Sequence, residues 1–137
     1  MFTIPQEYAA QMVKQALEEA PNEACGLIAG KNGVPVKLYP TTNSEASPTR
    51  YLIEPREQLD IMLEMEQNGW DLLAIYHSHI GHPPTPSHRD IKMAYYHDAV
   101  YLIVSVRDKE MPELKAFHIA EGKVAEEELR IAGPAPD

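Results

Sequence analysis

The 137-residue sequence contains one cysteine, Cys25, so it cannot form an intrachain disulfide. The fold must therefore rest on packing, and such a chain suits the reducing cytoplasm. Basic residues are also scarce, because 12 Lys and Arg stand against 21 Asp and Glu, for a formal net charge of −9. A uniformly acidic chain has no electrostatic attraction to a phosphate backbone, so we expect no nucleic-acid partner.

Long apolar segments are missing as well. The longest uninterrupted apolar run covers residues 99–104, far short of the roughly 20 residues that a membrane-spanning helix needs. Residues 1–15 lack the basic start and apolar stretch of a secretory signal. We therefore expect a cytoplasmic protein with no membrane partner.

The length suits a single domain with a sizeable core, since 44% of the residues are apolar. Apolar spacing and turn residues predict helices over residues 6–19, 55–68 and 87–96. Strands are predicted over residues 24–30, 34–40, 50–54, 72–76, 100–106, 114–120 and 124–131. The second helix would carry Leu59, Met62 and Leu63 on one face. This irregular mixture favours an α/β sandwich-like domain, which we place at residues 1–131 with a flexible tail at 132–137.

The most informative segment is residues 76–90, YHSHIGHPPTPSHRD. His77 and His79 are two residues apart, so on an extended strand both imidazoles project to the same face. A helix beginning at Ser87 can present Asp90 to the same point. Two imidazoles and one carboxylate leave a fourth tetrahedral position open, which is typical of catalytic rather than structural zinc. Zinc held in this way lowers the pKa of its water to about 7.

Each part of this pattern also has a simpler interpretation. Ser87 and Asp90 fit a capping box at the start of a helix. The two interpretations are compatible, because a capped helix would hold Asp90 in place. Two histidines spaced by two on a strand are, by themselves, more often a coincidence than a ligand pair. The combination of His77, His79, Ser87 and Asp90 is what favours a metal site.

His-x-His, followed after seven residues by Ser and after two more by Asp, resembles the signature of the JAMM (MPN+) metalloproteases. The segments EACGLIAG, TTNSEASPTRY, IYHSH, PSHRD and DAVYLIVSVRD are similar to those of compact bacterial members, most of all the CysO–cysteine peptidase type. The resemblance implies an MPN/cytidine-deaminase-like single domain, an α/β (α+β) fold whose mixed β-sheet or partial barrel is flanked by helices. Ile80 departs from the proline that many members have, which affects the shape of the loop but not the spacing to Ser87.

The resemblance also implies a role for each residue of the site. His77, His79 and Asp90 would bind one Zn²⁺ per chain. Glu23 would act as a general base towards the zinc-bound water and then as a general acid towards the leaving amine. Ser87 would hydrogen-bond the developing oxyanion or the water. A glutamate before a strand is more often a solvated charge, so the role of Glu23 depends on the resemblance alone.

Other polar residues are weaker candidates. In similar proteins the loop that holds Asn43, Ser44 and Pro48 lines the substrate cleft, so the resemblance makes them candidate substrate-binding residues, although by sequence they are only turn formers. Cys25 is more simply a small buried residue than a nucleophile or a zinc ligand. The remaining histidines are interpreted as solvated or without an evident partner: His82, His88, His97 and His118.

The resemblance implies a zinc-dependent metallopeptidase that hydrolyses a peptide or isopeptide bond at the C-terminus of a ubiquitin-like sulfur-carrier protein ending in Gly-Gly, with cysteine as a candidate product. Two alternatives stay open: a non-catalytic MPN scaffold or binding module, and a zinc hydrolase of another small amide. The intact set of His77, His79, Asp90 and Glu23 argues against a scaffold. The oligomeric state does not follow from the sequence, so a homodimer is left open.

Overall fold

The computed structural model describes residues 1–133 of the chain. The strands are β1 (Phe2–Pro5), β2 (Cys25–Lys31), β3 (Val34–Thr41), β4 (Asp71–His79), β5 (Val100–Ser105), β6 (Glu113–Ala120), β7 (Lys123–Glu127) and β8 (Leu129–Ala132). The helices are α1 (Gln6–Glu19), α2 (Pro55–Asn68) and α3 (His88–Lys92). Six strands form a mixed sheet of order β3-β2-β4-β5-β6-β7, and β1 pairs with β8 separately. The predicted fold class, a mixed sheet flanked by helices, is confirmed.

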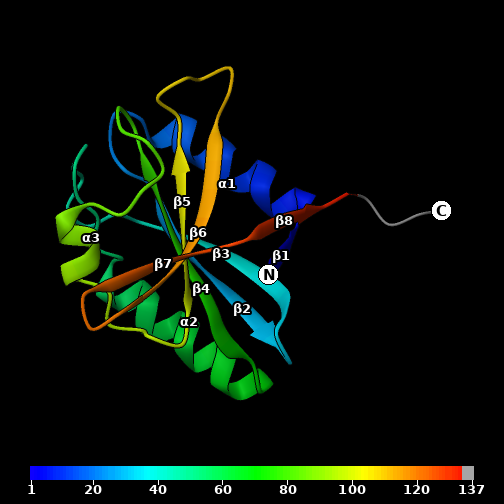
Figure 1. Ribbon diagram of the computed structural model, residues 1–137. Coiled ribbons are helices and arrows are strands. Elements are labelled where there is room, and N and C mark those ends of the chain that lie inside the picture. Colours follow the sequence, from blue (N-terminus) through cyan, green and yellow to red (C-terminus); the bar gives the residue numbers. More distant parts are fainter. Residues whose placement is uncertain (134–137) are drawn as a thin grey trace.

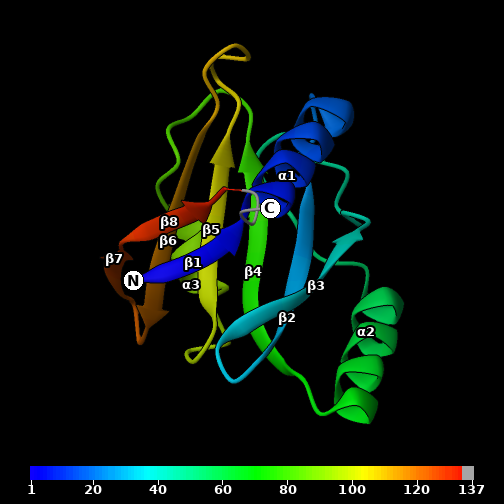
Figure 2. The ribbon, with the colours of Figure 1, turned by 90° about the vertical axis from the view of Figure 1, so that its right-hand side faces the viewer.

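The large sheet separates two clusters of buried side chains. On one face, α1 and the β1–β8 pair cover a core that includes Met12 and Leu102. On the other face, α2 and α3 cover a core that includes Met65 and Ile103. Figures 1 and 2 show these helices on opposite sides of the sheet. No helix in the described part of the chain is both long and apolar enough to cross a bilayer.

The parallel pair β4 and β5 forms the centre of the sheet. All six residues of β5 and the last six of β4 are buried. Strands covered on both faces have continuous apolar sequences, which is the pattern of residues 72–76 in the predicted strand. β4 continues beyond that apolar run and carries His77 and His79 into the same buried layer.

Three predicted elements differ from the structure. Residues 50–54 do not form a strand, because only Ile53 pairs there, in an isolated bridge with Asn43. The short third helix ends at Lys92 rather than near Tyr96. The apolar pattern over residues 124–131 is two strands rather than one: the chain leaves the large sheet after β7, and β8 pairs with β1, a strand that the pattern missed.

The helix α2 begins and ends where the sequence predicts, but its apolar stripe does not face the core. Pro55 opens the helix, and Gly69 closes it in the left-handed conformation at φ 68°. Leu59 and Leu63 are 54% and 46% exposed, and the buried residue of the helix is Met65. Residues 134–137 of the predicted tail lie outside the described residues, whereas Ala132 belongs to β8.

Candidate metal centre

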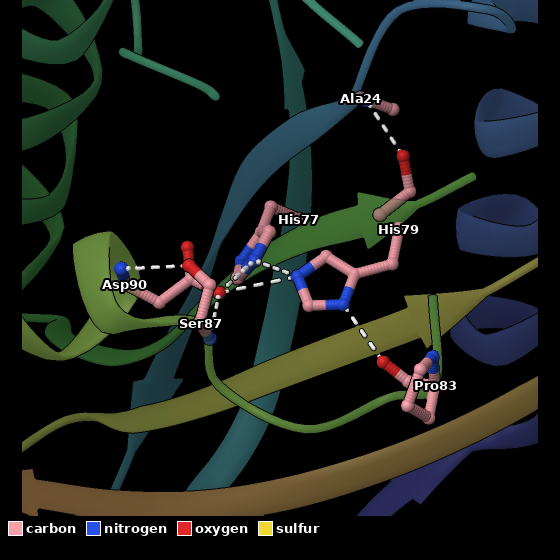
Figure 3. Close-up of polar contacts among 7 residues, drawn as sticks. Ala24, His77, His79, Pro83, Ser87 and Asp90 are labelled. Carbon is pink, nitrogen blue, oxygen red and sulfur yellow. Dashed lines mark hydrogen bonds and ion pairs between the residues drawn. The ribbon is translucent and has the colours of Figure 1, made fainter. Parts of the chain in front are cut away.

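The structure brings the three predicted metal ligands together. His77 and His79 lie at the C-terminal end of β4, and Asp90 lies in the first turn of α3 (Figure 3). The two Nε2 atoms of His77 and His79 are 3.1 Å apart. Asp90 Oδ2 is 3.0 Å from Nε2 of His77 and 3.1 Å from Nε2 of His79. The three atoms therefore form a nearly equilateral triangle.

This triangle suits a zinc ion. The ligand atoms of a tetrahedral zinc site, with bonds of about 2.0–2.1 Å, are roughly 3.3 Å apart, which is close to the separations observed here. Imidazole and carboxylate are ligands that zinc accepts readily. His77 and His79 are only 1% and 4% exposed, yet their Nε2 atoms face each other rather than separate acceptors. His77, His79 and Asp90 could therefore hold one zinc ion.

Helix capping is what holds Asp90 at this point. Ser87 is the N-cap of α3, and its Oγ accepts the N–H of Asp90 at 3.0 Å. Asp90 Oδ2 in turn accepts the N–H of Ser87 at 2.9 Å. The capping box is thus present, and the same carboxylate oxygen faces both imidazoles. Capping fixes the candidate ligand instead of competing with it.

The two imidazoles are held in different ways. His79 Nδ1 lies 2.8 Å from the carbonyl of Pro83, which can only accept, so Nδ1 carries the hydrogen and leaves Nε2 free as a ligand. His77 Nδ1 has no hydrogen-bond partner among residues 1–133. Its ring instead stacks on Tyr51, with centroids 4.4 Å apart and planes 17° apart. Sequence reasoning missed Tyr51, because an aromatic residue in a loop has no periodic signal.

Burial and hydrogen bonding set the charges of this cluster. Burial would raise the pKa of Asp90, but hydrogen bonds from His77 and His79 outweigh it and hold that pKa well below its usual range. Burial lowers the pKa of His77 and so favours the neutral ring. Burial would also lower the pKa of His79, yet its contacts with Asp90 and Pro83 raise it. Metal binding needs an ionised carboxylate and neutral imidazoles. These pKa shifts favour an ionised Asp90 and a neutral His77.

Glu23, which immediately precedes Ala24 and β2, is buried rather than solvated. It is 2% exposed, and its Oε1 has no hydrogen-bond partner in the described part of the chain. Burial raises the pKa of Glu23 to about 8, against a smaller opposing effect of His79. A carboxyl group with such a pKa can take up and release a proton near neutral pH, as general acid–base catalysis requires.

A cavity of about 370 Å³ lies beside Glu23 and His79. It is lined by Glu23, Thr49, His79, His82, Pro83, Thr85, Pro86 and Ser87. The proposed base and the proposed oxyanion donor therefore face one space, beside the imidazole of His79. His82 is exposed, as expected, but its ring also meets that of His79 edge-on at 6.1 Å. Tyr51, which stacks on His77, lines a second cavity of about 270 Å³ together with three further tyrosines.

The predicted substrate-binding residues lie in the loop between β3 and α2. Asn43 and Ser44 both direct their side chains to backbone atoms, and Ser44 Oγ donates to the carbonyl of Leu52 at 3.1 Å. Pro48 is exposed. Within residues 1–133, Thr49 is the member of this loop that lines the cavity beside His79. Substrate binding by Asn43, Ser44 and Pro48 stays a prediction.

Two other residues can be assigned from their surroundings. Cys25 is fully buried, with Sγ 3.3 Å from Thr41 Oγ1, and burial raises its pKa to about 11. It is therefore a protonated thiol and not an activated nucleophile. The expectation that His118 lacks a partner is wrong, because its Nε2 lies 2.7 Å from Oε2 of Glu127 on the neighbouring strand.

The raised pKa of Glu23 predicts a pH-dependent stability for the metal-free protein. The pKa of an unfolded glutamate is about 4.3, whereas that of folded Glu23 is about 8. The folded state therefore binds more protons between these values, and the free energy of unfolding falls as the pH rises through this range. Glu23→Gln removes this pH-dependent contribution of Glu23. Between about pH 5 and pH 8, the free energy of unfolding of the variant should therefore rise by on the order of 3 kcal/mol relative to that of the wild type. Urea unfolding across that range measures the difference, and a constant difference would contradict the raised pKa.

Comparison with known proteins adds independent information. Residues 5–120 match the Prok-JAB family model, described as prokaryotic homologs of the JAB domain. The CysO-cysteine peptidase of Mycobacterium tuberculosis is 40% identical over 122 residues, which cover 88% of this chain and 84% of that protein. A desampylase of Pyrococcus furiosus is 32% identical over 129 residues, which cover 93% of this chain and 89% of that protein.

Solved structures share the fold. A protein from Desulfitobacterium hafniense superimposes with a TM-score of 0.87 and 34% identity, covering 98% of this chain and 94% of its own. A JAB1/MPN domain protein from Archaeoglobus fulgidus has a TM-score of 0.63 and 18% identity, covering 96% and 98%. The mixed sheet and its flanking helices are therefore the architecture of a known domain type.

Proposed function

This chain belongs to the family of prokaryotic JAB-domain proteins and is a JAMM-type peptidase. On that premise, we propose that it uses zinc to cleave a peptide or isopeptide bond. The bond would lie at the C-terminus of a ubiquitin-like sulfur-carrier protein. One observation carries the proposal: two imidazoles and one carboxylate converge beside a cavity that a buried glutamate also lines. We also propose that residues 1–131 form the peptidase domain and that the protein is cytoplasmic, which fits its single buried thiol.

The side chains of the site divide the reaction between them. A zinc ion held by His77, His79 and Asp90 would polarise the scissile carbonyl and lower the pKa of the attacking water to about 7. Glu23 takes the proton of that water and passes it to the nitrogen of the leaving amine. Ser87 Oγ already accepts the N–H of Asp90, so its own hydrogen is free to donate to the developing oxyanion.

The depth of the site supports a flexible, narrow substrate. His79 and Glu23 are nearly inaccessible and both line the cavity of about 370 Å³, so the reacting bond must enter that cavity to reach them. A bond within a folded domain cannot do this, whereas an extended C-terminal tail can, because the two glycines at its end carry no side chains. The relatives named as a CysO-cysteine peptidase and a desampylase support a ubiquitin-like carrier as the partner.

A zinc assay combined with a substrate panel tests the proposal. The purified protein should hold about one zinc ion per chain, and a chelator should abolish cleavage until zinc is restored. The panel contains ubiquitin-like carriers ending in Gly-Gly, each free, extended by cysteine, or linked to a lysine side chain. Cleavage directly after Gly-Gly is expected. If the protein binds zinc and hydrolyses small amides but cleaves no carrier, the carrier proposal is wrong. The alternative of a zinc hydrolase of small amides then replaces it.

A further inference from the structure

The loop between β3 and α2 holds Asn43, whose side chain is fully used by the protein backbone. Its Nδ2 donates to the carbonyls of Glu23 and Arg50, each at 3.0 Å. Its Oδ1 accepts the N–H groups of Glu45 and Leu52, also at 3.0 Å. An asparagine amide has two donor hydrogens and one oxygen with two lone pairs, so no hydrogen-bonding capacity remains for a substrate.

Three of these four bonds connect two segments that meet at the site. One is Glu23, whose N–H is also held by this loop, through the carbonyl of Ser47 at 2.8 Å. The other is the segment 50–52, to which Asn43 is hydrogen-bonded at both ends, through the carbonyl of Arg50 and the N–H of Leu52. Tyr51 lies between these two hydrogen-bonded residues, and its ring stacks on His77.

At each end of this connection, one side-chain atom lacks a hydrogen-bond partner in the described part of the chain. Glu23 Oε1 and His77 Nδ1 are buried without a partner among residues 1–133. Metal-binding histidines are normally oriented by a hydrogen bond to the second ring nitrogen, as Pro83 provides for His79. On its Nδ1 side, the ring of His77 is therefore held by stacking on Tyr51, while its Nε2 lies against Asp90. The position of Glu23 Oε1 depends on the backbone of Glu23. Asn43 holds the backbone on which each depends.

We propose that Asn43 is a positioning residue that holds the general base Glu23 and the Tyr51 ring in fixed relation to the metal-binding His77. The assignment rests on the proposed function for the roles of Glu23 and His77. It replaces the expectation that Asn43 contacts substrate. An aspartate at this position would keep the two acceptor contacts, to Glu45 and Leu52, but would place a carboxylate oxygen against the carbonyls of Glu23 and Arg50.

The variants Asn43→Asp and Asn43→Ala test this role, with Asn68→Ala as the matched control. Asn68 Nδ2 makes the same kind of bond, to the carbonyl of Glu64 at 2.8 Å, at the far end of α2. In the Asn43 variants we expect kcat on a Gly-Gly carrier substrate to fall about 10- to 100-fold while KM stays within about twofold, because the reacting groups are misplaced. Zinc affinity, measured by chelator competition, should fall about tenfold.

A spectroscopic measurement on the metal-free protein separates positioning from general loss of stability. NMR signals of the His77 ring protons should move in the Asn43 variants, because the stacked Tyr51 ring shifts them, and should stay unchanged in Asn68→Ala. A raised KM with unchanged kcat and unchanged His77 signals would make Asn43 a substrate contact and overturn the proposal. Unchanged kinetics and signals would overturn it too.

The Tyr51 ring offers a second test if the Asn43 variants do not fold. Tyr51→Phe keeps the stacked ring and should bind zinc as wild type does, whereas Tyr51→Leu should bind it about tenfold more weakly. Equal zinc affinities in both variants would overturn the link to His77. A wild-type protein that cleaves no carrier, but whose zinc affinity and His77 signals respond as expected, would contradict the proposed function and still support the positioning role.

Discussion

Replacing Glu23 by glutamine should leave about one zinc ion per chain and reduce kcat about 10²- to 10⁴-fold, the range that general acid–base catalysis contributes. Glutamine has nearly the same shape, so it fits the buried position of Glu23, but it cannot take up a proton. The triangle of ligand atoms belongs to His77, His79 and Asp90, and it does not depend on this carboxylate. Metal binding and turnover are therefore expected to separate.

Zinc content, measured by atomic absorption, and steady-state cleavage of a Gly-Gly carrier substrate give the two readouts. Glu66→Gln is the matched control, because Glu66 lies exposed on α2 and should keep both properties. Normal turnover in Glu23→Gln would remove the general-base role. Loss of zinc together with turnover would make Glu23 a ligand instead.

The candidate ligands could be predicted from the sequence because local rules place them. Alternate residues of a strand point to one face, which brings His77 and His79 together on β4. A capping box fixes the first turn of a helix, which aims Asp90. Only the approach of α3 to the end of β4 is a tertiary event. The convergence of these residues was therefore predicted correctly, although the predicted length of α3 was wrong.

The surroundings of the ligands could not be predicted, because long-range contacts create them. Asn43 reaches Glu23 across 20 residues of sequence, and no periodicity marks such a bond. The same loop brings Tyr51 against His77, although residues 50–54 suggested a strand. The pairing of β1 with β8 joins the two ends of the described chain and likewise has no local signal. Sequence patterns thus indicated which side chains could bind a metal, but not what orients them.

The two uses of Asp90, as helix cap and as metal ligand, can be separated by Asp90→Asn. The asparagine side-chain oxygen can still accept the N–H of Ser87, so α3 should stay capped. The negative charge between His77 and His79 is lost, however, and a neutral amide is a poor zinc ligand. Zinc affinity should therefore fall by more than the roughly 10- to 100-fold that loss of an outer hydrogen-bond partner costs.

Two further variants complete the comparison. Ser87→Ala should still bind zinc, because the Ser87 N–H still reaches Asp90 Oδ2, but it should lose about 1 kcal/mol of stability with the side-chain cap. Asp98→Asn, at an exposed position, should change neither property. Chelator competition measures the affinity, and thermal unfolding with and without zinc measures the coupling, because a ligand that binds only the folded state raises the unfolding temperature. Zinc should raise that temperature in Ser87→Ala but not in Asp90→Asn. Wild-type zinc affinity in Asp90→Asn would contradict the prediction. It would show that the Asp90 carboxylate only caps α3 and is not a metal ligand.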